Sequence, residues 1–325
     1  MNQATILITG GTGFAGSHLV EALLKENIPA ANIHVTTLNQ EPGFVQDLLP
    51  KANLHLLDLT QAEKVAVLFK TLQPDQIYHL ASFSSPSKSL EKTARAIETN
   101  VEIQLNVLEA VRHHVPQSRL LSIGSASEYA GSSKPLSETS LLGPHDPYGV
   151  SKVAQDMLAY SYTVRYELDI VRVRPFNHIG ERQLPGFVVS DFAQQIIKIE
   201  TGQADKMRVG NLAVTRDFSD VKDIVRGYIL LMGSGETGEV YNLGSGRDVT
   251  IMQLLEKMRQ LATTEIPIHV DEQKRRPGDI QRSVADITKI KALGWQPTIP
   301  LENTLERILN WWRDQTKQPT AKGSS

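Results

Sequence analysis

The chain has 325 residues, a formal net charge of -2 and no cysteine. The length fits one large α/β body with a smaller appended part. The near-neutral charge argues against binding nucleic acid or an anionic membrane through bulk charge, and the lack of cysteine excludes disulfides, a thiolate nucleophile and a cysteine metal site. No apolar run reaches the ~20 residues that span a bilayer, and "MNQATILITG" lacks the apolar stretch of a signal peptide. We therefore expect a cytoplasmic protein without a metal site.

Short β-branched runs alternate with longer amphipathic stretches through the first half of the chain. The runs are "TILITG", "IHVTTL", "LHLLDL", "QIYHL", "RLLSIG" and "DIVRVRPF", and the stretches between them include 14–26, 61–72, 89–114 and 148–166. This alternation predicts βαβ units and a parallel sheet covered by helices. We predict an α/β, doubly wound, Rossmann-like domain over 1–176 and a smaller substrate-binding lobe mainly over 177–315. Some lobe segments can return to the first domain, and a disordered tail is expected over 316–325.

A glycine-rich segment, "ITGGTGFAGSHLVEALL", ends the first predicted strand and opens the first predicted helix. Gly10, Gly13 and Gly16 suit a tight turn, a close approach of backbone to a pyrophosphate, and close packing of helix on strand. An ordinary strand-to-helix turn is the alternative. The spacing is GxxGxxG rather than GxGxxG, which indicates a particular branch of dinucleotide-binding folds.

The end of the second predicted strand bears on the choice of cofactor. NAD sites place an acidic side chain about 20 residues beyond the glycines to hold the ribose 2′-hydroxyl. Here "VTTLNQE" offers Thr36, Thr37 and Asn39 instead. The missing acid removes repulsion toward a 2′-phosphate, although no arginine is present either. We expect NADP(H) to be preferred and leave NAD(H) open.

Two further segments carry residues for acid–base chemistry. "SIGSASEYAG" places hydroxyl groups and a carboxylate at the end of the fifth predicted strand, and "DPYGVSK" places Tyr148 and Lys152 on one face of a predicted helix. A phenol with an ordinary pKa of about 10 reaches working range when a cation favours the phenolate. Alone, such a pair is usually a surface contact. Together with the glycine turn and the hydroxyl-rich strand end, it predicts a catalytic pair.

These segments resemble the extended short-chain dehydrogenase/reductase family, which contains NAD-dependent epimerases, dehydratases and reductases of sugar nucleotides. The resemblance covers about residues 5–312. It rests on "TGGTGFAGSHL", "LLDLT", "IYHLAS", "ETNVEIQLNVLEA", "SASEYAG", "PYGVSK", "RPFNHIG", "RDFSDVKDI", "YNLGSG" and "LGWQPTIPLENTL". Within the family, "RPFNHIG" followed by "PGFVVSDFAQQI" looks most like the GDP-sugar members. GDP-6-deoxy-4-keto-mannose reductases are the most similar of these, and GDP-mannose 4,6-dehydratases are near relatives.

The resemblance implies two sets of binding residues. The cofactor set comprises Gly10, Gly13, Phe14, Ala15, Gly16, Thr37, Asn39, Asp58, Leu59, Leu80, Ala81, Asn100, Tyr148 and Lys152, with Asp58 as the adenine contact. The substrate set comprises Ser82, Ser125, Asn177, Val188, Arg216, Arg276 and Asp279, with Arg275 in the same charged cluster. Such amide, guanidinium and carboxylate groups can contact a diphosphate, a ribose and a base. His178 is expected to be structural, because no second ligand stands at metal-binding spacing.

The resemblance also assigns roles within "SASEYAG". In the family this strand ends in a Ser or Thr that hydrogen-bonds the substrate's C4 oxygen, and dehydratases follow it with an acid–base pair. Aligned on the trailing glycine, the hydroxyl position carries Ala126, flanked by Ser125 and Ser127, and Glu128 stands at the place of the dehydratase base. We therefore expect a site that lacks one hydroxyl, which Ser125, Ser127 or water could replace. Capping of a turn is the alternative for Ser127.

The resemblance implies reduction of the C4 ketone of a GDP-4-keto-6-deoxy-mannose-type sugar nucleotide to a GDP-6-deoxyhexose such as GDP-rhamnose. NAD(P)H supplies the hydride, Tyr148 donates the proton, and Lys152 keeps the pKa of the phenol low and holds the nicotinamide ribose. The alternatives are GDP-mannose 4,6-dehydratase or another sugar-nucleotide epimerase/dehydratase, and a non-catalytic sugar-nucleotide-binding subunit, for which Ala126 is the hint. We expect a homodimer, and leave open whether the helices at 89–114 and 148–166 form the four-helix interface that is common in this family.

Overall fold

A seven-stranded sheet, parallel throughout, forms the centre of the molecule. The computed structural model describes residues 4–38, 43–83, 93–271 and 280–317. The strand order is β11-β6-β5-β4-β1-β2-β3. The strands are β1 (Ile6–Thr9), β2 (Ile33–Thr37), β3 (Leu54–Leu56), β4 (Gln76–His79), β5 (Arg119–Ile123), β6 (Ile170–Pro175) and β11 (Val240–Leu243). The predicted α/β, doubly wound, Rossmann-like class is confirmed.

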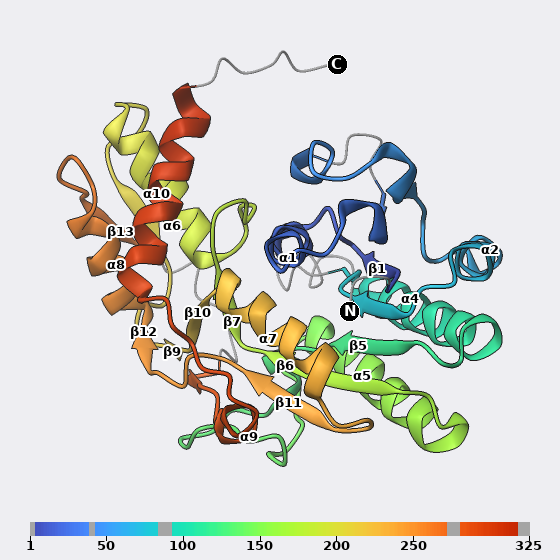
Figure 1. The fold of residues 1–325 in the computed structure, drawn as a ribbon. Helices are drawn as coiled ribbons and strands as arrows, with labels where there is room; N and C mark the ends of the chain where they lie inside the picture. The colour runs from blue at the N-terminus through green and yellow to red at the C-terminus, as the bar shows by residue number, and fades with distance from the viewer. Residues whose placement is uncertain (1–3, 39–42, 84–92, 272–279, 318–325) are drawn as a thin grey trace.

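Helices cover both faces of the sheet because successive strand side chains point to opposite sides. In β1, Ile6 and Ile8 share one core with residues of two helices, α1 (Phe14–Lys25) and α7 (Val221–Ser234). Leu7, between them, belongs to the core on the other face. Residues of α2 (Ala62–Leu72), α4 (Thr93–His114) and α5 (Pro147–Tyr166) complete that second core (Figure 1). Short 3-10 helices lie in the connections at η1 (Ala30–Asn32), η2 (Gly43–Val45), η3 (Lys51–Asn53) and η4 (Ala126–Glu128).

The lobe has its own core, away from the sheet. It is built from α6 (Val188–Glu200), α8 (Ile251–Gln260) and α10 (Leu301–Lys317), which lie together at the left of Figure 1. Pairs and triplets of short strands connect these helices to the body: β7 (Asn177–Ile179) with β10 (Phe218–Asp220), β8 (Met207–Val209) with β13 (Ile268–Val270), and β9 (Thr215–Arg216) between β12 (Val249–Thr250) and β14 (Arg282–Ser283).

The chain passes more than once between the body and the lobe. α7 and β11 follow residue 176, yet α7 packs on the body and β11 forms the sheet edge beside β6. Residues of the short helix α9 (Thr288–Ala292) and Trp295 also join the body core. α10 ends at Lys317, so residues 316 and 317 of the expected tail are helical, and 318–325 lie outside the described residues. No helix in the described part of the chain is long and apolar enough to cross a membrane.

Candidate active site

Glycines shape the turn between β1 and α1. Gly10 has a φ of 68°, in the left-handed region that glycine adopts without strain. A Cβ at Gly16 would stand 2.4 Å from the carbonyl oxygen of Gly10, so only glycine permits this approach of α1 to the turn. Gly13, the N-cap of α1, offers no side-chain hydrogen bond to the first helical turn. The helix therefore presents backbone N–H groups and the positive end of its dipole, which fits a dinucleotide pyrophosphate.

Two buried threonines at the end of β2 support the glycine turn. Thr36 Oγ1 accepts a hydrogen bond from Gly10 N at 3.2 Å, and Thr37 Oγ1 accepts one from Thr12 Oγ1 at 3.1 Å. The described end of β2 carries no carboxylate, and Asn39 lies outside the described residues. The two hydroxyls thus bind the turn itself.

The residues after β4 lie against the same turn, and Asp58 after β3 is held by a local contact. Ala81 N donates a hydrogen bond to Thr9 Oγ1 at 3.2 Å, and Ala81 Cα stands 3.0 Å from the position of a Cβ on Gly10. Asp58 Oδ1 accepts hydrogen bonds from the backbone N–H and the hydroxyl of Thr60 at 3.0 and 2.8 Å. Of their predicted neighbours in the cofactor set, Leu59 is buried and Leu80 is half-buried.

Asn100, expected in the cofactor set, forms hydrogen bonds within the chain. Its side chain is fully buried on α4. Its Oδ1 accepts a hydrogen bond from Phe83 N at 2.6 Å, and its Nδ2 donates to Ser151 Oγ at 2.9 Å. Asn100 therefore ties the loop after β4 to α5, and it supports the site from behind.

Ser125, Tyr148 and Lys152 meet beyond the carboxyl end of β5. The Ser125 side chain lies close enough to the Tyr148 side chain to oppose the increase that burial causes in the pKa of its phenol. Lys152 Nζ donates to Ile123 O at 2.9 Å and lies 5.9 Å from the centroid of the Tyr148 ring. α5 begins here because the N-cap, Asp146, accepts a hydrogen bond from the third helical residue and a proline occupies the first helical position. The start of α5 thus fixes both catalytic candidates against β5.

This arrangement corrects the reading of "SIGSASEYAG". We expected the hydroxyl position at Ala126, but Ser125 is the residue that reaches Tyr148. Ser125 is the extended N-cap of η4, with φ −162° and ψ 149°, and this conformation turns its side chain toward α5. Ser127 contributes backbone: its N–H donates to Ser125 Oγ at 3.1 Å, and its carbonyl oxygen would stand 2.4 Å from a Cβ on Gly149. Ser125 thus offers the hydroxyl that is missing at Ala126, which is one of the replacements that the sequence left open.

Burial sets the pKa values of the catalytic pair. It raises the pKa of Tyr148 above the ordinary value, while the Ser125 side chain acts in the opposite direction. Burial lowers the pKa of Lys152 to about 8, against the attraction of Glu128. The expectation that Lys152 keeps the pKa of the phenol low therefore does not hold for the protein chain itself. Tyr148 is a neutral phenol at pH 7, which is the form that can donate a proton.

Glu128 is a buried structural group in this arrangement. Its Oε1 accepts a hydrogen bond from Ser125 N at 2.7 Å, and its Oε2 lies 2.8 Å from Arg174 Nε. Arg174 Nη2 is 2.6 Å from Asp156 Oδ2, and Arg172 Nη1 is 3.1 Å from the same oxygen. Burial raises the pKa of Glu128, and the guanidinium of Arg174 opposes that increase. The carboxylate expected at the place of a dehydratase base thus closes the capping box of η4 and holds Ser125.

Three buried charged residues of this site were not predicted from the sequence: Arg172, Arg174 and Asp156. A signal was present in "DIVRVRPF", where two arginines stand two positions apart in an otherwise apolar strand. That spacing puts both charges on one face of a buried strand. Buried charges require partners, so acidic groups facing this strand could have been sought.

The expected substrate residues are only partly placed by the described chain. Asn177 is exposed at the start of β7, and its Nδ2 donates to Asp217 O at 3.3 Å. Arg216 Nη1 donates to the carbonyl oxygens of Thr215 and Ile280 at 2.9 and 2.7 Å. Arg275, Arg276 and Asp279 lie outside the described residues, immediately before Ile280. Arg216 thus stands at the border of the charged segment.

Phe14 connects the glycine turn between β1 and α1 to the lobe. Its ring stacks on His178 with centroids 5.8 Å apart and planes 4° apart. His178 Nδ1 lies 3.0 Å from Phe176 O, so this histidine is held by packing and by a backbone contact. The remaining predicted residues are half-buried and stand in the first turn of α1, after β4 and at the start of α6: Ala15, Ser82 and Val188.

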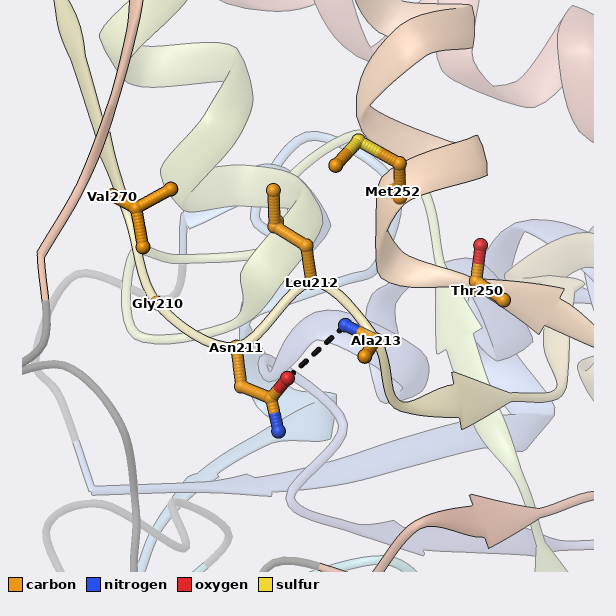
Figure 2. Close-up of a pocket in the computed structure, with 7 residues that line it drawn as sticks. All are labelled: Gly210, Asn211, Leu212, Ala213, Thr250, Met252 and Val270. Carbon is orange, nitrogen blue, oxygen red and sulfur yellow. Dashed lines mark hydrogen bonds between the residues drawn. The ribbon is translucent and has the colours of Figure 1, made fainter.

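The lobe contains an open pocket of ≈ 450 Å³. Figure 2 shows its walls, where Asn211 Oδ1 accepts a hydrogen bond from Ala213 N at 3.1 Å. The pairing of β12 with β9 puts Thr250 opposite Thr215 and Val249 opposite Arg216. It is lined by Gly210, Asn211, Leu212, Ala213, Thr250, Met252 and Val270.

Comparison with known proteins decides the family. The sequence profile described as GDP-mannose 4,6 dehydratase matches residues 7–308. The chain belongs to the GDP-mannose 4,6 dehydratase family. A relative in this group of enzymes, GDP-6-deoxy-D-mannose reductase of Pseudomonas aeruginosa, is 30% identical over 318 residues, which cover 96% of this chain and 98% of the relative. dTDP-D-glucose 4,6-dehydratase of Homo sapiens is 26% identical, over 95% of this chain and 90% of that one.

Solved structures agree with membership of the GDP-mannose 4,6 dehydratase family. RMD from Pseudomonas aeruginosa complexed with NADPH has a TM-score of 0.84 at 29% identity, covering 96% of this chain and all of that one. UDP-glucose 4-epimerase of Thermus thermophilus, in complex with NAD, has a TM-score of 0.84 at 27% identity, covering 95% and 98%. The expected resemblance to extended short-chain dehydrogenases/reductases is confirmed. The protein is an NAD(P)-dependent oxidoreductase of sugar nucleotides.

Proposed function

We propose that the protein uses NAD(P)H to reduce the C4 ketone of a GDP-4-keto-6-deoxy-mannose-type sugar nucleotide to a GDP-6-deoxyhexose such as GDP-rhamnose. One observation carries the proposal. The Ser125 side chain interacts with Tyr148 beside Lys152, while the nearby carboxylate of Glu128 is buried against Arg174. Removal of water by a 4,6-dehydratase needs a working acid–base pair, which this arrangement does not offer. The relative named GDP-6-deoxy-D-mannose reductase supports the same choice.

The mechanism follows from the states of the three side chains. Bound NAD(P)H supplies a hydride to C4 of the sugar. The neutral phenol of Tyr148 donates its proton to the forming alkoxide, and the Ser125 hydroxyl steadies the phenol and the C4 oxygen. The Lys152 ammonium holds the nicotinamide ribose and favours the phenolate left behind. The substrate would thus gain one hydride and one proton, and the oxidised cofactor would be the second product. Because Ser125 reaches Tyr148, the hint of a non-catalytic subunit from Ala126 loses its support.

We also propose that NADP(H) is preferred to NAD(H). Thr36 and Thr37 leave a neutral end of β2, where an acid would repel a 2′-phosphate. Similar solved structures hold either NADPH or NAD. Dissociation constants of both reduced cofactors test this preference, and a clear preference for NADH would contradict it.

The lobe pocket is the proposed seat of the substrate's base and ribose. Apolar side chains of Leu212, Met252 and Val270 line it, and Arg216, on the strand that pairs with β12, offers a guanidinium for a diphosphate. The charged segment with Arg275, Arg276 and Asp279 begins two residues after Val270. These groups suit a nucleoside diphosphate attached to the sugar.

A panel of sugar nucleotides tests the reaction. GDP-, dTDP- and UDP-linked 4-keto-6-deoxy sugars are incubated with NADPH or NADH, cofactor oxidation is followed by absorbance, and products are identified by NMR. We expect reduction with the GDP-linked substrate to be fastest and to require Tyr148. Conversion of GDP-mannose to the 4-keto sugar with oxidised cofactor, without ketone reduction, would instead establish the dehydratase.

We further propose that the protein is a homodimer formed by α4 and α5. Four large apolar side chains of α5 are 39–64% exposed: Val150, Met157, Tyr160 and Val164. A shallow groove lies beside them on α4, lined by Ile97, Glu98, Val101, Glu102, Leu105 and Asn106. Such a self-complementary apolar face suits a two-fold interface.

Light scattering after size exclusion should give a dimer that Val164→Glu converts to monomer. Val67→Glu, at an equally exposed valine on α2, should leave it dimeric; a monomeric wild type refutes the dimer.

A further inference from the structure

A polar cluster lies beneath Lys152, within the apolar layer between the sheet and helices α4 and α5. His79, the last residue of β4, is in register with Thr9 on β1 and with Ser122 on β5. Paired residues of parallel strands point to the same face. The three side chains therefore stand side by side on the face that carries Leu7 and Leu120 of the second core.

The hydrogen bonds around His79 fix the position of its ring proton. Thr9 Oγ1 accepts the N–H of Ala81 at 3.2 Å and lies 2.7 Å from His79 Nδ1. We assign the ring proton to Nε2, because Nδ1 is then the acceptor for the Thr9 hydroxyl proton, which has no other acceptor among the hydrogen bonds of the described residues. That Nε2–H is buried and has no partner among the described residues. His79 is 2% exposed, so a donor points into the layer below Lys152.

An unpartnered acceptor faces the same layer from α5. Gln155 stands three residues after Lys152 and is 2% exposed. Its Nε2 donates to Asn100 O at 2.9 Å, while its Oε1 has no partner in the described part of the chain. Buried donors and acceptors of this kind are satisfied in proteins by internal waters that make about three hydrogen bonds.

We propose that His79 is a positioning residue for Lys152: Nε2–H of His79 and Oε1 of Gln155 hold one internal water, and this water supports the Lys152 ammonium. The water accepts from His79 and from Lys152 and donates to Gln155. It thereby gives the ammonium an acceptor in addition to Ile123 O. The inference rests on the proposed function of Lys152 in holding the nicotinamide ribose.

The charges around Lys152 are consistent with this role. Glu128 raises the pKa of Lys152, and Tyr148 lies beside it on α5. Burial and then the charge of Lys152 lower the pKa of His79 to about 3, so the imidazole stays neutral and adds no second cation. Asp156, also on α5, is paired with arginines of β6. The other facing groups, on β1, β5 and α4, are uncharged: Thr9, Ser122, Asn100 and Gln104.

Two substitutions separate the two nitrogens of His79. In His79→Gln the amide N–H₂ reaches the place of Nε2 and can still donate to the water. In His79→Asn the amide oxygen replaces Nδ1 as acceptor for Thr9, but the donor to the water is lost. The two variants are matched controls for each other, because both replace the ring by a primary amide.

The measurement is the pH dependence of cofactor binding, which needs no sugar substrate. The dissociation constant of the reduced cofactor that binds wild type more tightly is followed by fluorescence from pH 6 to 9.5. In wild type and His79→Gln we expect the affinity for the cofactor to weaken as pH rises through about 8, where Lys152 loses its proton. The pH at which the affinity begins to weaken is called the break below. In His79→Asn the break should move down by at least about half a pH unit, a loss of affinity of about twofold at pH 8 that approaches about threefold at pH 9 and above.

An unshifted break in His79→Asn, or equal shifts in both variants, would overturn the role of Nε2. Gln155→Met removes the acceptor from the opposite side and should lower the break in the same direction. This variant carries the test if His79→Asn does not fold, and an unchanged break refutes the shared water. Failure of the proposed reaction would appear in the turnover panel and leave these binding curves unaffected.

Discussion

Glu128→Gln tests whether this buried carboxylate is structural or catalytic. The substitution keeps the size of the side chain and an oxygen that can accept the Ser125 N–H. The oxygen that lies 2.8 Å from Arg174 Nε is replaced by an uncharged amide N–H₂ group, which cannot pair with the guanidinium. The ion pair is therefore lost while the cap of η4 can remain.

The size of the effect follows from the partners of Arg174. Removing one side of a buried ion pair costs about 3–5 kcal/mol when the remaining charge is left alone. Here Arg174 keeps Asp156 at 2.6 Å. The loss should thus approach that of a hydrogen bond to a charged group, and we expect the free energy of unfolding to fall by about 2–3 kcal/mol. At about 2 °C per kcal/mol for a chain of this size, Tm should fall by about 4–6 °C.

The assay combines denaturation with turnover. Unfolding is followed by circular dichroism, and kcat is measured at a temperature where both proteins are folded. Glu256→Gln is the control, because its partner Arg259 forms an exposed i,i+3 pair that should contribute less than about 1 kcal/mol. We expect kcat of Glu128→Gln to stay within about threefold of wild type. A loss of about 100-fold or more in kcat with unchanged stability would show that Glu128 is a general base and would refute the structural role.

Four further results are expected. Tyr148→Phe should abolish turnover but retain cofactor binding, because it removes the proton donor and little volume; a near wild-type rate contradicts the mechanism. Ser125→Ala should lower kcat about 10²–10³-fold with a smaller change in KM, as for loss of one oxyanion donor, and an unchanged kcat means another group fills that role. Thr37→Asp should weaken NADPH relative to NADH in direct binding, since its carboxylate repels a 2′-phosphate; an unmoved ratio places the 2′-position elsewhere. Burial lowers the pKa of both His34 and His55, so stability should be full above about pH 6.5 and fall as pH drops below it. His34→Gln should flatten that fall in urea titrations, and equal slopes would exclude the pair.

The sheet and the glycine turn between β1 and α1 were predictable because their sequence patterns are local. A strand with apolar residues on both faces followed by spaced glycines has few other uses, and β1 and α1 begin and end close to the predicted segments. Tyr148 and Lys152 were found for the same reason, since a helix fixes their spacing. These features depend on residues near each other in the chain.

The placement of the hydroxyl depended on geometry that the sequence does not contain. Counting back from a trailing glycine selected Ala126, but the capping box turns Ser125 toward α5. Glu128 looked available because its partner Arg174 is 46 positions away in the chain, on another strand. The burial of Glu128 and its pairing with Arg174 depend on how β5, β6 and α5 pack together, which the sequence does not state. The proposed role of His79 was hidden likewise, because the residues grouped around it come from β1, β5 and α5.

The late return of α7 and β11 governs the order in which a growing polypeptide can become stable. When synthesis has reached residue 176, β6 is still an open strand edge, and the face formed by Ile8, Leu121 and Val171 lacks the helix that covers it. Open edges and uncovered apolar faces promote aggregation. A fragment ending there should thus be an aggregation-prone intermediate rather than an independent nucleotide-binding domain. Because α6 and its strands are inserted before the body is complete, neither part can be transplanted into another protein as one uninterrupted segment.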